Sequence, residues 1–115
     1  VRSARSGKPI NVIKNDGTQL IWAGDLAMVY AKLLQSGVNR KTYYGLGANF
    51  VSWESIAREA VKRTGSHSEI QLEDKGWSEN GLSWDTSDMK EDFGVEFDPW
   101  NRVADHLDYY IEHDR

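Results

Sequence analysis

Runs of strand-like patterning predict four short strands in this chain. Residues 11–14 alternate polar and apolar side chains, and residues 19–22 are rich in strand-forming types. An Asn-Asp-Gly-Thr cluster separates these two runs and suits the left-handed backbone of a tight turn, so we expect strand, turn and strand. Residues 42–46 and 69–72 are predicted to form two further strands.

Apolar residues at helical spacing predict about four helices, separated by polar loops. Each predicted helix has a side chain that can cap its first turn, and three are followed by a glycine that can end the helix. With the short strands, this pattern gives an α/β class in its mixed α+β form, as one domain over residues 1–115. The predicted caps are Asp25, Ser52, one of residues 85–87 and Asp98, and the predicted stops are Gly37, Gly65 and Gly94.

Composition and charge exclude or disfavour several functional classes for this chain. With 115 residues, 39% hydrophobic and 28% charged, the chain can bury one core. The net charge is −4, which disfavours a nucleic-acid partner because phosphate binding depends on basic patches. No apolar run reaches the roughly 20 residues that span a bilayer, so no membrane partner is expected. The absence of cysteine excludes a thiolate nucleophile and fits a cytoplasmic location.

Two patterns that can mark cofactor or metal sites are incomplete. Gly45 and Gly47 form a Gly-x-Gly pair, but Phe50 stands where a dinucleotide fingerprint needs its third glycine, so a turn is favoured. The last two histidines are seven positions apart, whereas paired helix ligands stand about three to five apart. We therefore expect no cofactor-binding residue and no metal ligand. The histidines are His67, His106 and His113.

No catalytic residue is predicted either. Four carboxylates gather near the start of the third predicted helix, where they can serve acid–base chemistry or cap the helix. Capping is favoured because carboxylates in a first helical turn usually serve it, and no serine lies in a Gly-x-Ser-x-Gly turn. These carboxylates are Asp85, Asp88, Glu91 and Asp92.

The five tryptophans offer the remaining chemistry. Trp22 precedes a predicted helix, and Trp77 and Trp84 flank a polar loop, where exposed indole rings can stack on flat ligands such as sugar rings. The alternative is that these three rings pack against their neighbours, while Trp53 and Trp100 belong to the core faces of helices.

A series of short motifs runs along almost the whole chain. Its members are Gly-Lys-Pro-Ile-Asn-Val at 7–12, Gln-Leu-Ile-Trp-Ala-Gly-Asp-Leu-Ala at 19–27, Lys-Thr-Tyr-Tyr-Gly-Leu-Gly at 41–47, Val-Ser-Trp-Glu-Ser-Ile-Ala at 51–57, Asp-Thr-Ser-Asp-Met at 85–89, and Phe-Gly at 93–94 with Pro99. In this order the motifs resemble the C-terminal part of the NAD-dependent epimerase/dehydratase family, the extended short-chain dehydrogenases/reductases.

The resemblance implies a role and partners. The chain would be the substrate-binding lobe of a longer parent that holds NAD or NADP in a separate Rossmann domain, absent here, and the lobe alone would be inactive. The start at Val1 rather than Met is expected of such a piece. The Rossmann domain and a small-molecule substrate, in this family commonly a nucleotide sugar, would be its partners, and a homo-oligomer is expected. The expected substrate contacts are Gln19, Trp22, Trp77 and Trp84.

Two positions depart from the family pattern. Sugar-nucleotide members carry an Arg shortly before the Asp-x-Ala strand and a second Arg before the closing Asp element. Here residues 18–20 and 76–84 contain no basic side chain. Because Arg pairs two oxygens of a pyrophosphate at once, a less charged substrate is expected. The alternative function is a stand-alone ligand-binding or protein-interaction module that uses its exposed Trp residues.

Overall fold

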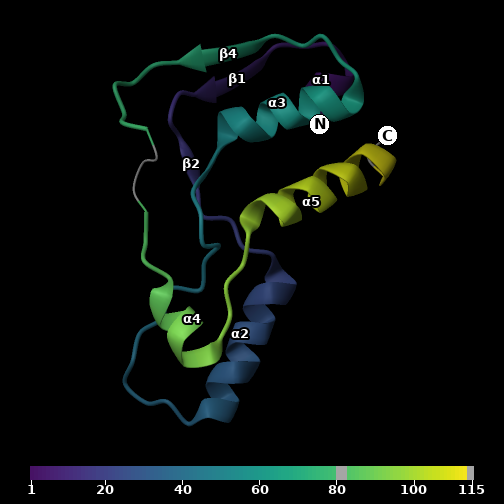
Figure 1. The fold of residues 1–115 in the computed structure, drawn as a ribbon. Helices are drawn as coiled ribbons and strands as arrows, with labels where there is room; N and C mark the ends of the chain where they lie inside the picture. The colour runs from purple at the N-terminus through teal and green to yellow at the C-terminus, as the bar shows by residue number, and fades with distance from the viewer. Residues whose placement is uncertain (80–82, 114–115) are drawn as a thin grey trace.

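The computed structural model describes residues 1–79 and 83–113, which form five helices and four short strands (Figure 1). The mixed α+β class is confirmed, and one four-residue helix, α1, was not predicted. The helices are α1 (Arg2–Arg5), α2 (Ala23–Ser36), α3 (Trp53–Thr64), α4 (Ser87–Phe93) and α5 (Pro99–His113). The strands are β1 (Ile10–Ile13), β2 (Gly17–Thr18), β3 (Val51–Ser52) and β4 (Ile70–Glu73).

Most helix ends lie where capping predicts them. At the start of α3, Ser52 Oγ accepts a hydrogen bond from the backbone N–H of Ser55 at 3.2 Å. At the start of α5, Asp98 Oδ1 accepts one from the N–H of Trp100 at 2.9 Å. Glycines 37, 65 and 94 adopt the left-handed backbone that ends α2, α3 and α4. These starts and stops are confirmed.

The strands form two separate pairs instead of the predicted hairpin. β1 runs parallel to β4, with Ile10 opposite Ile70, and β2 runs antiparallel to β3, with Gly17 opposite Ser52. The strands predicted at 11–14 and 69–72 are confirmed within one residue, as β1 and β4. The strands predicted at 19–22 and 42–46 are wrong, because both segments are irregular.

The irregular path has a physical cause at Gln19 and at Tyr43. The side chain of Gln19 is buried and bonds to the backbone of two other segments, at Gly47 and Trp84, which ends the extended ladder after β2. The hydroxyl of Tyr43 donates to Asp92 on α4 at 2.6 Å, so this segment packs on a helix and finds no strand partner. Long-range side-chain contacts therefore override the local strand preference.

The core is split into two small clusters. One lies between α2 and α4 and is made of Val29, Met89 and Val95. The other lies between α3 and α5 and is made of Ala60, Val103 and Leu107. Figure 1 shows these two helix pairs at opposite ends of the molecule, joined by the strands and by the chain between α4 and α5.

The molecule is a thin slab. Its extents are 51 × 36 × 16 Å and its radius of gyration is 16.8 Å, against about 13 Å for a compact domain of similar length. Domains ordinarily bury their apolar faces between two packed layers, and a thickness of 16 Å leaves room for little more than one. Within the described residues, no helix combines the length and apolar character needed to cross a bilayer.

The thin shape leaves large aromatic side chains uncovered. Trp22 is 53% exposed, and Trp77 and Trp84 are each 47% exposed, so of the two alternatives for these rings the structure favours exposure over packing. Trp53 and Trp100, which the sequence assigns to core faces, are also exposed, by 37% and 36%. Both belong to helix turns that border hollows instead of the two core clusters.

Candidate functional site

An apolar groove runs between α3, α5 and the segment that leads into α2. Its cavity volume is about 440 Å³, within the range of small-ligand sites. A shallower hollow of about 310 Å³ continues it toward α1 and β1 and shares Trp53, Ile56 and Leu107 with it. We call the two hollows together the apolar groove. Its wall on the α2 side is formed by Leu20, Ile21 and Trp22.

Trp22 is held at the rim of the apolar groove by two charged residues. The guanidinium carbon of Arg102 on α5 lies 4.4 Å from the centre of the Trp22 ring, a cation–π contact. Nε and Nη2 of the same guanidinium each donate to one carboxylate oxygen of Asp25, at 2.9 Å. The hydrogen bond to Asp25 raises the pKa of Arg102. This bidentate pair fixes α5 against the start of α2.

The prediction that Asp25 caps α2 is therefore wrong. The helix begins two residues earlier, at Ala23, and the position before it is Trp22, whose side chain makes no capping bond. Asp25 lies inside the first turn, where it is buried and its carboxylate accepts from Arg102. A partner 77 residues away in the chain competes successfully with the local capping role.

Gln19 and Trp84, two of the four expected substrate contacts, are joined by hydrogen bonds. Nε2 of Gln19 donates to the carbonyls of Gly47 at 3.0 Å and Trp84 at 2.9 Å, and its Oε1 accepts from the Trp84 N–H at 2.6 Å. Gln19 is only 4% exposed, and its side-chain amide joins the backbone at Gly47 to the backbone at Trp84. The ring of Trp84 is partly exposed to solvent, and its centre lies 5.0 Å from the centre of the Tyr44 ring.

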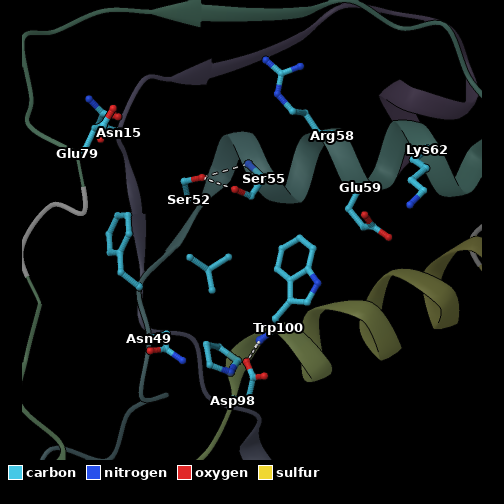
Figure 2. A pocket seen from close by; sticks show the side chains of 13 residues that line it. Asn15, Asn49, Ser52, Ser55, Arg58, Glu59, Lys62, Glu79, Asp98 and Trp100 are labelled. Atoms are coloured by element: carbon cyan, nitrogen blue, oxygen red, sulfur yellow. Dashed lines mark hydrogen bonds between the residues drawn. The ribbon is translucent and has the colours of Figure 1, made fainter.

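The four expected substrate contacts occupy three places. Gln19 and Trp84 share one, and Trp22 lies at the apolar groove. Trp77 stands apart beside the turn after β1, where its carbonyl accepts a hydrogen bond from Asn15 Nδ2 at 2.6 Å. None of the four lines the hollow between α3 and α5 that we call the polar pocket (Figure 2).

The polar pocket lies between α3 and the first turn of α5 and has a volume of about 700 Å³. Figure 2 shows Trp100 between the two helices, with Ser52 and Ser55 above it and Asp98 below. The sequence analysis missed Trp100 and Arg102 as site residues. Trp100 stands three and seven positions before Val103 and Leu107, which is typical of the inner face of a helix. One signal distinguishes Trp100 from the core residues: it lies in the first turn of the helix, before Val103 and Leu107, the residues that pack in the core.

The acidic residues near α4 act structurally. Asp85 Oδ1 accepts from the Ser87 N–H at 2.9 Å, which lowers the pKa of Asp85, but Thr86 is the residue at the capping position of α4 and its side chain makes no capping bond. Asp92 accepts from Lys41 and Tyr43, both at 2.6 Å, and these bonds lower the pKa of Asp92 while raising that of Lys41. The chain gathers no group of three metal-ligating side chains within residues 1–79 and 83–113.

The Gly-x-Gly pair is a packing feature. A side chain at Gly47 would collide with the Leu20 carbonyl and press on the Pro99 ring, and one at Gly45 would press on Leu26. Gly47 therefore permits a close approach of two segments inside the fold.

No family model, no curated protein and no solved structure matches this chain.

Proposed function

We propose that this chain is the substrate-binding lobe of an NAD(P)-dependent epimerase, dehydratase or reductase of the extended short-chain dehydrogenase/reductase type. The order of the motifs along the sequence motivates this proposal. The single observation that carries it furthest is the open apolar groove on a slab 16 Å thick. A domain that ordinarily packs against a second lobe would have such a face.

In this proposal the cofactor lobe covers the apolar groove and the substrate lies where the two lobes meet. The groove exposes Trp53 and Ile56, which suit an apolar partner surface. Trp22 stands at its rim, fixed by Arg102, and can stack on a ring of the substrate. Arg102 is already paired with Asp25, so the groove carries little net charge, which agrees with a less charged substrate.

The proposal assigns different roles to the cofactor lobe and to this chain. The cofactor lobe would hold NAD or NADP and supply the hydride chemistry. The residues of this chain would orient the substrate and exclude water, and the lobe would act in the cytoplasm as part of a homo-oligomer. No residue of this chain is assigned a proton transfer.

The test is a comparison of cofactor binding. The isolated chain is expected to bind neither NAD nor NADP with a dissociation constant below about 100 μM, because it lacks the glycine turn and helix N-terminus that hold a pyrophosphate. The full-length product of the gene is expected to bind one of them well below that value. Titration calorimetry measures both.

Two outcomes would contradict the proposal. Tight binding of NAD by the isolated chain would show that the cofactor site lies here. A full-length product that binds neither cofactor would favour the alternative, a stand-alone module that uses the exposed rings of Trp77 and Trp84.

The uncovered groove also predicts self-association of the isolated chain. Sedimentation at high concentration is expected to show a dimer or larger species. Placing a charge in the groove with Trp22→Glu should weaken this association by at least about tenfold. Tyr109→Glu is the matched control, since Tyr109 is 57% exposed and lies outside the groove. A monomer at every concentration, or equal effects of both variants, would contradict this prediction.

A further inference from the structure

The polar pocket and the apolar groove lie on adjacent faces of α3. Ser52, Ser55 and Glu59 recur at helical spacing and line the pocket, whereas Trp53, Ile56 and Ala60 line the groove. Each of these groove residues directly follows a pocket residue, and successive residues of an α-helix point about 100° apart. The two hollows share only Pro99 among the described residues that line them, so a ligand in the polar pocket would leave most of the apolar groove open to the cofactor lobe.

The pocket combines one aromatic wall with short polar side chains. The ring of Trp100 stands between α3 and α5 (Figure 2), and the apolar residues Phe50 and Pro99 also line the pocket. Hydroxyl and amide groups surround this wall, from Ser52, Ser55 and Asn49. A flat apolar face next to several hydroxyl and amide groups suits a ring that has one apolar face and hydroxyl groups at its edge.

The charges of the pocket nearly cancel. Arg58 pairs with Glu54 on the same helix, Nη2 to Oε1 at 2.7 Å, and Glu59 pairs with Arg63 at 2.8 Å. Lys62 then faces a pocket that also contains the carboxylates of Glu79 and Asp98. Such a balance offers no cluster of cations for a phosphate. A neutral ligand is favoured on this ground.

Trp100 is fixed before any ligand arrives. Pro99 is fully buried and packs at Gly47, so the first turn of α5 cannot shift without disturbing the fold. Asp98 Oδ1 accepts from the Trp100 N–H, and its Oδ2 has no partner among the described residues and can accept from a hydroxyl. Ser52 Oγ and Ser55 Oγ lie 2.7 Å apart and keep each other in place. Because the aromatic ring and the hydrogen-bonding groups are already ordered, a ligand loses less conformational entropy of the protein when it binds.

We propose that the polar pocket binds a neutral polyhydroxylated ring, a sugar without phosphate, stacked on Trp100. The hydroxyl groups of this ring bond to Ser52, Ser55 and the carboxylate of Asp98. The site is separate from the groove that the proposed cofactor lobe would cover, because the two hollows share only Pro99 among the described residues that line them.

The experiment is a titration of the isotope-labelled chain, followed by amide and indole NMR signals. The probes are glucose, galactose and N-acetylglucosamine, with glucose 6-phosphate as the charged counterpart. We expect at least one neutral sugar to shift the indole signal of Trp100 and the amides of Ser52 and Ser55. Trp100→Ala should weaken that binding by at least about tenfold, and Trp100→Phe, which keeps a flat ring, by less.

Matched variants separate binding from folding. Tyr109→Ala removes an exposed aromatic ring from the same helix and should leave sugar binding unchanged, since Tyr109 does not line the pocket. If Trp100→Ala unfolds the chain, Ser55→Ala provides the test, because Ser52 still caps α3 without it. No shift at the pocket with any neutral sugar would overturn the proposal, as would tighter binding of the phosphorylated sugar. Neither result bears on cofactor binding by the full-length product.

Discussion

Met89→Ala is expected to lower the free energy of unfolding by about 2–5 kcal/mol, the usual cost of deleting a large buried side chain. Met89 is 1% exposed and lies at the centre of the cluster between α2 and α4. This cluster has only three buried members, so few neighbours can move in to fill the space. Denaturant unfolding followed by circular dichroism measures the change.

The chain provides its own control for this substitution. Met28, its only other methionine, lies on α2 and is 42% exposed. Met28→Ala should change the free energy of unfolding by no more than about 0.5 kcal/mol. Equal effects of the two variants would show that the cluster around Met89 does not stabilise the fold.

Gln19→Leu is expected to cost about 1–3 kcal/mol of stability and to release the Trp84 segment. The substitution keeps most of the volume but leaves the Gly47 carbonyl and both backbone groups of Trp84 without the partner they have now. The indole NMR signal of Trp84 should move and sharpen as the segment gains freedom. Denaturant unfolding gives the stability change.

Gln35→Leu is the matched control for this prediction. Gln35 lies exposed on α2, and its substitution should leave both stability and the Trp84 signal nearly unchanged. If Gln19→Leu unfolds at the same denaturant concentration as the parent chain, the hydrogen bonds of Gln19 to Gly47 and Trp84 do not stabilise the fold.

The sequence predicts those features whose causes lie within one helical turn. Ser52 caps α3 through an N–H three residues on, and Gly65 ends the same helix through its own backbone conformation. Such local interactions are visible in the order of residues alone. The same reasoning placed β1 and β4 from their alternation and flanking turns, without their partners.

Features that depend on distant residues were beyond this reasoning. The sequence gives no sign that β1 pairs with β4 across 60 positions or that Asp25 bonds to Arg102. Gln19 was expected to contact a substrate, yet its amide is committed to the backbone of two other segments. The polar pocket is not predicted because Trp100 has the periodicity of a core residue, and its place beside a hollow depends on α3 residues far away in the sequence.

The division of the core into two clusters has a consequence for cooperativity. Small domains usually unfold in one step because all of their helices and strands pack against one shared core. Here α2 and α4 share one cluster, and α3 and α5 share the other. The links between them include the bidentate pair of Arg102 with Asp25 and the hydrogen bonds of Gln19 to Gly47 and Trp84, with no buried apolar residue shared by the two clusters. We therefore expect each helix pair to open at a lower cost than the whole chain, through partly unfolded states that the proposed covering lobe would suppress.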